Sequence, residues 1–434
     1  MSFSVCATGD SLFCAGFPEE YSAIRASLDA FLGGCDLKIT NLETNLCGFG
    51  PFANQYSGGT WLSVREELFP DLESFGFNFF GTANNHCMDY SYAGMLSTVD
   101  FLDRRGYAHA GTGRCLGEAE RPAVIRMRDG STAAVFAVDA SSEPPSMAGR
   151  GSAIFAPRPG VNYLRHSNLF TVSEKDLEEL RRIAARSSVN FLRDGEIASG
   201  YLPPDPDGVF VFGGTAFTSR TDLPASRCDA SDLSRITRSV RKAKAEYTAV
   251  FVLVHCHGEE GTCASDPPAY LTEFCRAAID AGADAVFGGG VHELRGLEIY
   301  RGKPVFYSLG DFIYQGMRVE YLPPDFMEKY GLDVNATAAE GLAARSKGGR
   351  IGLQTNEKNF LTVVPKLTFA EGRLSEIEIL PVKLGFKTGN EALDGLPLAA
   401  EGDEGRKIYE KFRALSEKLG TRLKYEDGIV RIGG

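Results

Sequence analysis

The sequence predicts an α/β protein with a mostly parallel, covered sheet, and three observations support this class. Short apolar runs at residues 3–7, 37–40 and 77–82 alternate with segments whose apolar residues recur at helical spacing. Such an alternation is typical of parallel sheets. The run at residues 249–254 is apolar throughout, as expected for a strand buried on both faces. The 434 residues are 43% hydrophobic and 24% charged, which are ordinary values for a globular protein with a large core.

The elements of the first half follow from local patterns. Apolar spacing predicts helices over residues 21–32, 64–75 and 92–104. Residues 141–168 are rich in Pro, Gly and Arg, and we expect an irregular excursion there. A helix over residues 173–186 would have Ser173 as its N-cap, and a loop would follow at 202–208.

The second half continues with a charged amphipathic helix at 232–245 and then the strand at 249–254. A helix over 267–281 would end at Gly282, a residue suited to the helix C-cap. After a strand at 285–287, two hairpins are predicted, at 297–307 and at 361–380. The polar, Gly-rich stretch 317–358 between them is expected to be an insertion or lid, and residues 407–419 a terminal helix.

The charge balance limits the classes of partner. The chain has 46 Lys and Arg against 57 Asp and Glu, a net charge of −11, which argues against a nucleic-acid or anionic membrane partner.

No apolar run approaches the roughly 18–20 residues of a membrane helix. The N-terminal residues lack the order of a secretory leader, so a cytoplasmic location is expected. The ten cysteines have no Cys-x-x-Cys spacing, and reduced thiols are expected.

Residues that ligate metals follow several of the predicted strands. In an open α/β sheet the carboxyl ends of the strands form the ligand site, so these side chains are expected to converge. The set contains four of the six histidines and consists of Asp10, Glu43, Asn85, His86, His255, His257 and His292. Imidazole, carboxylate and amide ligands suit one or two divalent ions such as Mn, Zn, Fe or Ni. The sequence therefore predicts a metal centre.

Five segments carry a family resemblance: residues 8–10 (TGD), 41–43 (NLE), 83–90 (ANNHCMDY), 282–298 and 300–312 (YRGKPVFYSLGDF). With them the chain resembles the CapA-type poly-γ-glutamate biosynthesis proteins, a branch of the calcineurin-like metallophosphoesterase superfamily. The resemblance implies a four-layer α/β/β/α sandwich with the metal site at one rim. It gives a CapA-like domain over residues 1–385, with an insertion at about 317–358, and an extension over 386–434 that packs on it.

The resemblance also implies roles for single residues. Asp10 and Glu43 would be metal carboxylates, with Glu43 as the bridge. The remaining metal ligands would be Asn85, His255 or His257, and His292. His86, poised by Asp89, would be the acid/base group, and His257 is a second candidate for that chemistry. The candidates for binding the substrate are the arginines Arg158, Arg165 and Arg295.

Two departures from the family pattern bear on the metal count. Gly289 and Gly290 stand where histidines are usual, so His257 or Glu259 would have to replace a missing ligand, or the site would hold one ion. Asp311 stands where Asn is more usual, and a turn or helix cap is its simplest role.

Three functions remain open from the sequence. The first is hydrolysis of a peptide or γ-glutamyl amide, or of a phosphoester, by a metal-activated water with His86 as acid/base. The second is epimerisation of a peptide or amino acid by proton transfer at an α-carbon. The third is a non-catalytic part in poly-γ-glutamate synthesis. The first two predict a small-molecule or peptide substrate, and the oligomeric state stays open.

Overall fold

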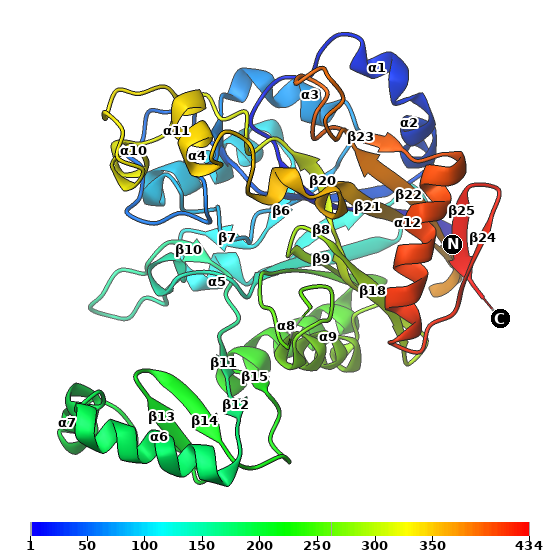
Figure 1. The fold of residues 1–434 in the computed structure, drawn as a ribbon. Coiled ribbons are helices and arrows are strands. Elements are labelled where there is room, and N and C mark those ends of the chain that lie inside the picture. Colours follow the sequence, from blue (N-terminus) through cyan, green and yellow to red (C-terminus); the bar gives the residue numbers. More distant parts are fainter. Residues whose placement is uncertain (1, 262, 434) are drawn as a thin grey trace.

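The computed structural model describes residues 2–261 and 263–433, which form a mixed α/β protein with two large mixed sheets (Figure 1). The strands of the larger sheet are β1 (Ser2–Leu12), β2 (Leu37–Leu42), β5 (Phe79–Gly81), β6 (Ala108–Ala110), β20 (Asp311–Tyr314), β21 (Leu361–Ala370), β22 (Arg373–Leu384), β23 (Pro397–Ala399), β24 (Leu423–Glu426) and β25 (Ile429–Ile432). Their order is β24-β25-β22-β21-β1-β2-β5-β6, with β20 beside β1 and β23 beside β22.

The smaller sheet has the order β18-β19-β17-β16-β9-β8. Its strands are β8 (Ala123–Arg126), β9 (Thr132–Asp139), β16 (Ala249–Cys256), β17 (Ala285–Gly290), β18 (Leu294–Tyr300) and β19 (Lys303–Leu309). The strands β1, β2, β5 and β6 of the larger sheet pair in parallel, as do β9, β16, β17 and β19 of the smaller sheet, in line with the prediction. The pair β1–β21 is antiparallel, and β21–β22 and β18–β19 are the two predicted antiparallel hairpins. Each of the eight residues of β16 is buried, as the continuous apolar run predicted.

The two sheets share one buried cluster. Val5, Ile39 and Phe79 of the larger sheet belong to it together with Val135 and Phe251 of the smaller sheet. Helices α8 (Ala230–Glu246) and α9 (Ala269–Ala281) form a second cluster with β9, β16 and β17. Helices α1 (Tyr21–Ile24), α2 (Ala26–Gly33), α3 (Phe69–Glu73) and α4 (Ser91–Arg105) contribute to a third cluster with the larger sheet.

Several predicted helices differ in detail. The expected helix at 64–75 was wrong: its first residues form β4 (Ser63–Val64) and a 3-10 turn (Glu66–Leu68), and only α3 is helical, beginning where Pro70 can occupy the first turn. The helix at 21–32 is interrupted at Arg25. The predicted caps were correct, since the Ser173 side chain accepts from the Asp176 amide and Gly282 closes α9 in the left-handed conformation.

A lobe of residues 169–225 stands off the main body (Figure 1). It contains α6 (Glu174–Ser187), α7 (Phe191–Ala198) and the sheet β12-β14-β13 (Phe170–Thr171, Thr215–Thr218, Val209–Phe212). The strands β11 (His166–Asn168) and β15 (Ser226–Cys228) pair where the chain leaves and re-enters the main body. The sequence predicted α6 and the loop at 202–208, but not α7 or the hairpin.

The remaining short elements surround the sheets. Two of them are two-stranded sheets. One pairs β3 (Asn45–Leu46) with β4, and the other pairs β7 (Thr112–Gly113) with β10 (Gly160–Val161). Helix α5 (Leu116–Ala119) and a 3-10 turn (Pro144–Ser146) lie between β7 and β10 in the sequence. The stretch 317–358, the expected insertion or lid, contains two helices, α10 (Pro324–Lys329) and α11 (Ala338–Arg345). Two 3-10 turns (Leu353–Thr355, Glu357–Phe360) follow. Beyond residue 385, α12 (Gly402–Glu417) packs near β18, and β23 and β25 pair with β22.

Two further observations concern the cysteines and the membrane. Cys6 and Cys35 form a disulfide, so the expectation that the thiols are all reduced was wrong for this pair, which the turn after α2 brings beside β1. The other eight cysteines are free. Within residues 2–261 and 263–433, no helix combines the length and the apolar character needed to span a membrane.

Candidate metal centre

The residues predicted from strand ends lie at one edge of the two sheets. Asp10 is in β1, Glu43 directly follows β2, and His255 is in β16 with His257 just after it. The strand register explains this convergence. Asp10 stands opposite Asn41 and Asp311 on the neighbouring strands, and His255 stands between Asp139 and Gly289.

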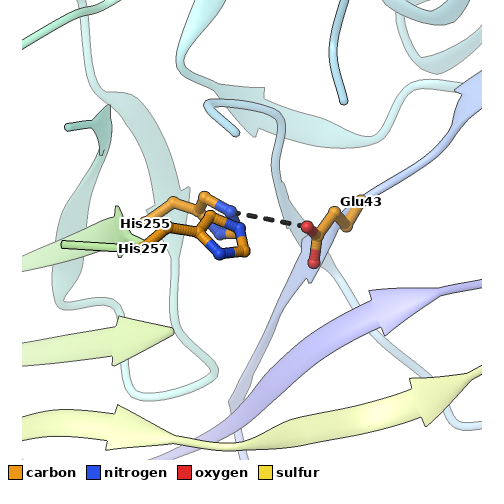
Figure 2. A group of neighbouring side chains, drawn as sticks. All are labelled: Glu43, His255 and His257. Atoms are coloured by element: carbon orange, nitrogen blue, oxygen red, sulfur yellow. Dashed lines mark ion pairs between the residues drawn. The ribbon is translucent and has the colours of Figure 1, made fainter. Parts of the chain in front are cut away.

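Two groups of possible ligands overlap at Glu43. One consists of Glu43, His255 and His257, and the other of Asp10, Glu43 and Asp311. In each group the potential ligand atoms all lie within 4.8 Å of one another. Figure 2 shows the two imidazoles side by side, facing the Glu43 carboxylate, with His255 Nε2 3.4 Å from Glu43 Oε1. Glu43 thus stands between a carboxylate-rich side and an imidazole side.

The surroundings of Glu43 are unusual for a carboxylate. Its side chain is fully buried, and neither oxygen has a hydrogen-bond partner among the described residues. Burial raises its pKa well above the ordinary value, and the neighbouring Asp10 and Asp311 carboxylates raise it further. A buried carboxylate without a hydrogen-bond donor is costly, and a bound cation would remove this cost. The residues present therefore fit one or two divalent ions.

Asp10 is held by the protein. Asn41 Nδ2 donates to its Oδ1 at 2.7 Å, and His255 Nδ1 lies 3.5 Å from the same oxygen. Burial acts to raise the pKa of Asp10, but the charge and hydrogen bond of His255 and the bond from Asn41 lower it below its ordinary value. A Cβ atom at Gly289 would lie 2.5 Å from Asp10 Oδ2. The Asp10 carboxylate therefore fills the space that a histidine at this position would need.

Asp311 and His292 form a buried pair at the carboxylate side. His292 Nδ1 lies 3.1 Å from each Asp311 oxygen. Burial raises the pKa of Asp311. Burial acts to lower the pKa of His292, but the Asp311 carboxylate raises it above its ordinary value. Asp311 thus belongs to a ligand group and orients His292, which is more than the cap expected from the sequence. His292 itself is in neither group.

The imidazole side is formed by His255 and His257. Asn85 Oδ1 lies 2.7 Å from His255 Nε2, and Asn85 Nδ2 donates to the Gly58 carbonyl at 3.1 Å. His257 Nε2 is buried with no hydrogen-bond partner in the part of the chain that the structure describes. Burial lowers the pKa of His257 well below its ordinary value, and the nearby histidines add to this. A neutral imidazole with a free nitrogen suits a metal ligand.

His86 is oriented by Asp89. Its Nδ1 donates to Asp89 Oδ2 at 2.6 Å, and its Nε2 lies 3.9 Å from Glu43 Oε1. Asp89 also accepts from the backbone amides of Gly58 and Leu62, at 3.1 and 2.8 Å. A Cβ atom at Gly58 would lie 2.6 Å from His86 Nε2, so only glycine allows this close approach. The arrangement fixes one ring nitrogen and directs the other toward the cluster.

The three predicted arginines have other contacts. Arg158 is exposed and donates to the Met147 carbonyl, and Arg165 pairs with Asp232 at 2.7 Å beside a different hollow. Arg295 is fully buried and donates to the carbonyls of Ala264 and Gly258, which supports the loop after His257. The structure does not bring Arg158 or Arg165 to the cluster.

Sequence reasoning missed three polar residues of this region. Asn41 lies between Asp10 and His255, Asn84 donates to Asn41 Oδ1 at 3.2 Å, and Asp139 ends β9 beside His255. The signal for Asp139 was present, because an apolar run at 133–138 precedes it as in the other strands. Asn41 and Asn84 lie within the recognised segments 41–43 and 83–90, but their types alone do not distinguish them from turn residues.

A hollow of about 310 Å³ lies beside the cluster. His86 and His292 line it from the sheet edge, and Arg345, Ile351 and Gln354 line it from the stretch 317–358. Tyr314, whose ring lies 6.0 Å from that of His292, forms part of its wall. The hollow therefore provides space for a ligand next to the candidate metal ligands.

The comparisons with known proteins agree with the resemblance. Residues 4–316 match the family described as bacterial capsule synthesis protein PGA_cap, and the chain belongs to this family. The uncharacterized protein y4uA of Sinorhizobium fredii is 31% identical over 99% of this chain and 93% of its own. The PGA biosynthesis protein CapA of Bacillus subtilis is 24% identical over 58% of this chain and 47% of its own. A probable polyglutamine synthesis accessory protein of Mycobacterium tuberculosis is 25% identical over 65% of this chain and 57% of its own.

Proposed function

We propose that this PGA_cap protein is a metal-dependent hydrolase that acts on a peptide or γ-glutamyl amide, or on a phosphoester. The observation that carries the proposal is the buried Glu43 carboxylate, which two ligand groups share and which has no hydrogen-bond partner among the described residues. A carboxylate that bridges two ions is a typical feature of hydrolytic metal centres. The name of the Bacillus subtilis relative is the reason to include a γ-glutamyl amide.

We extend the proposal to the fold and the domains. The buried cluster between the sheets and the helical clusters on their other faces support a four-layer sandwich of the metallophosphoesterase type. We divide the chain into a domain over 1–385 and an extension over 386–434, whose strands join the larger sheet.

In this proposal Asp10, Glu43 and Asp311 would hold one ion, and Glu43, His255 and His257 the other. Ions held there would supply Lewis-acid activation of a water and of the bond to be cleaved. Asp89 accepts the Nδ1 proton of His86 and keeps the ring in place. His86 Nε2 then gives a proton to the leaving atom of the substrate, which would lie in the hollow that His86 lines.

The test is a hydrolysis screen. The full chain, loaded separately with Mn, Zn, Fe and Ni, is assayed on peptide amides, γ-glutamyl amides and phosphoesters. We expect turnover of one class, its loss on chelation and its return with the ion. Turnover that survives complete removal of the metal would contradict the proposal.

A second candidate is a metal-assisted epimerase. The observation that favours it is that two imidazoles, His86 and His292, line the same hollow, so two groups could exchange an α-proton. Incubation in heavy water separates the candidates. Deuterium at the α-carbon of uncleaved substrate indicates epimerisation, whereas cleavage without such exchange indicates hydrolysis. Absence of both would favour a non-catalytic part, in line with the printed name of the mycobacterial relative.

We also propose a cytoplasmic location. Its support is that eight of the ten cysteines are free and only Cys6 and Cys35 are paired, since secreted proteins tend to pair their cysteines. Fractionation of cells that express the full-length protein tests this directly. Recovery outside the cytoplasm would contradict it.

A further inference from the structure

Arg345 brings a positive charge to the hollow beside the candidate metal ligands. It is the last residue of α11 and is partly buried, and it lines the same hollow as His86 and His292. It therefore comes from the stretch 317–358, whereas the candidate metal ligands come from the two sheets. This places a guanidinium beside the proposed reaction site.

The hydrogen bonds of the Arg345 side chain are with neutral groups. Nη1 donates to the Thr60 hydroxyl, and Nη2 lies 3.5 Å from the Met317 sulfur, a weak acceptor. Within residues 2–261 and 263–433, no carboxylate forms an ion pair with it. Arg65, which reaches the same stretch from the main body, is different, because its Nη2 lies 2.7 Å from Glu320 Oε1.

The guanidinium is held in place by neutral groups. The Phe326 ring lies under it, with its centroid 5.7 Å from Arg345 Cζ. Helix α11 begins with a capping box of Thr337 and Glu340, and it packs tightly on α10 because a Cβ at Gly341 would lie 2.9 Å from Met327 Sδ. A fixed guanidinium with unused donors is prepared for an external oxyanion, since Arg binds carboxylate and phosphate through paired hydrogen bonds.

We propose that Arg345 binds an oxyanion of the substrate, a carboxylate or a phosphate group, and so selects anionic substrates for the metal centre. This inference rests on the proposed function and deepens it. The source of the oxyanion can be a peptide or amino-acid carboxylate or a phosphoester, and the two are distinguished by probes of each kind.

The test measures binding without turnover. The full chain loaded with zinc is titrated with N-acetylglycine, with its neutral analogue N-acetylglycinamide and with methylphosphonate, each followed by NMR of the probe. We expect at least one anion to bind, and Arg345→Ala to weaken its binding by roughly ten- to a hundredfold without affecting the neutral amide. Loss for N-acetylglycine identifies a carboxylate, and loss for methylphosphonate a phosphate.

Three comparisons keep the test specific. Arg345→Lys keeps the charge but not the planar fork, so an intermediate loss is expected. Arg350→Ala removes an exposed arginine that donates to the Lys347 carbonyl at 2.8 Å, and binding should not change. The zinc content of each variant is measured to show that the fold and the cluster persist. If Arg345→Ala does not fold, Arg345→Gln takes its place.

The inference is overturned if the wild type binds neither anion, or if the Arg345 variants bind both anions as tightly as the wild type does. The two proposals fail separately. Arg345-dependent binding without any hydrolysis would contradict only the proposed function. Hydrolysis of an anionic substrate with the same KM in Arg345→Ala would contradict only the role of Arg345.

Discussion

Two hollows of this protein differ in size and in the state of the charges around them. The larger one, about 1050 Å³, is lined by residues of β11, β15, α8 and α9, where the lobe joins the main body. There Arg165 is paired with Asp232, and the Asp229 side chain caps α8 by accepting from two backbone amides. Three further arginines of this hollow form no ion pair in the described part of the chain, but all are exposed to solvent: Arg227, Arg238 and Arg241. The smaller one, about 310 Å³, lies next to Glu43 and His257, where both Glu43 oxygens and His257 Nε2 are buried without a hydrogen-bond partner among the described residues.

From this contrast we infer that buried polar groups without hydrogen-bond partners, and not the volume of a hollow, indicate the functional site. Charges that have protein partners or face solvent need no ligand, and an exposed ion pair contributes little to stability. Buried groups without partners are rare in folded proteins, because each costs free energy unless a ligand or ion completes it. The predictions below test this contrast, beginning with the largest expected effect.

Replacing His86 should have the largest effect on turnover. His86→Asn removes the acid/base nitrogen but none of the residues in the two ligand groups. We expect kcat to fall roughly 10²- to 10⁴-fold while the metal content stays the same, as measured by steady-state kinetics and elemental analysis. A variant that keeps wild-type kcat would show that His86 is not the acid/base group.

Asp311→Asn should mainly affect the metal. The change removes one carboxylate of the Asp10 group but keeps a side chain of the same shape beside His292. We expect metal affinity to fall roughly ten- to a hundredfold, measured by competition with a chelating dye. Ser308→Ala, which removes a hydroxyl bonded to the Glu293 carbonyl, is a control that should leave affinity unchanged. If the wild type, Asp311→Asn and Ser308→Ala bind metal with equal affinity, Asp311 is not a metal ligand.

The stability of the metal-free protein should depend on pH with a definite sign. The pKa of Glu43 is raised in the folded state, and burial raises those of Asp89, Asp139 and Asp311 as well. The folded state then binds more protons than the unfolded state above the ordinary carboxyl pKa. The stability that these groups contribute is therefore fully present below the ordinary carboxyl pKa of about 4, and it is lost as the pH rises through their raised pKa values in the folded state.

Urea unfolding of the chelated protein between pH 5 and 8 measures this dependence. Bound metal should reverse its sign, because protons and metal compete for the same oxygens. Glu43→Gln should flatten the profile of the metal-free protein, since it removes the most strongly raised group. A metal-free profile that rises with pH throughout would contradict this description of the cluster.

Much of this site could be predicted from the sequence because it depends on strand order. Asp10, Glu43, His255 and His292 follow apolar runs, and parallel pairing brings the ends of such runs together. The positions of Arg158 and Arg165 could not be predicted, because residues 141–168 are placed by pairings with distant segments such as β7 and β15.

Other features differ in how far a local sequence pattern determines them. Arg345 reaches the hollow only because α10 and α11 pack on Trp61 and Tyr90, contacts that no local pattern encodes. The hairpin β13–β14 lies in a small lobe whose strands are only half-buried, so the alternation of buried and exposed residues is weak. Helix α12 was predicted because its amphipathic spacing is local.

Arg165→Ala should have the smallest effect. The Arg165 guanidinium is half-exposed, but its partner Asp232 is buried and keeps only Arg235 at 3.8 Å as a basic neighbour, so we expect a loss of roughly 1–2 kcal/mol in the free energy of unfolding. Turnover and metal content should not change, in contrast to the expected effect of Arg345→Ala. A large loss of turnover would restore Arg165 as a substrate-binding residue and would give the larger hollow a functional role.

The central claim is that Glu43 is shared by two metal sites, and elemental analysis of the wild type and of Glu43→Gln tests it most directly. Both proteins are incubated with Mn, Zn, Fe and Ni in turn, and the metal atoms per chain are measured after removal of free ions. We predict close to two ions per wild-type chain for at least one metal, and the loss of both ions in the variant. A wild-type chain that binds no metal, or a Glu43→Gln chain that binds as much as the wild type, would contradict the claim.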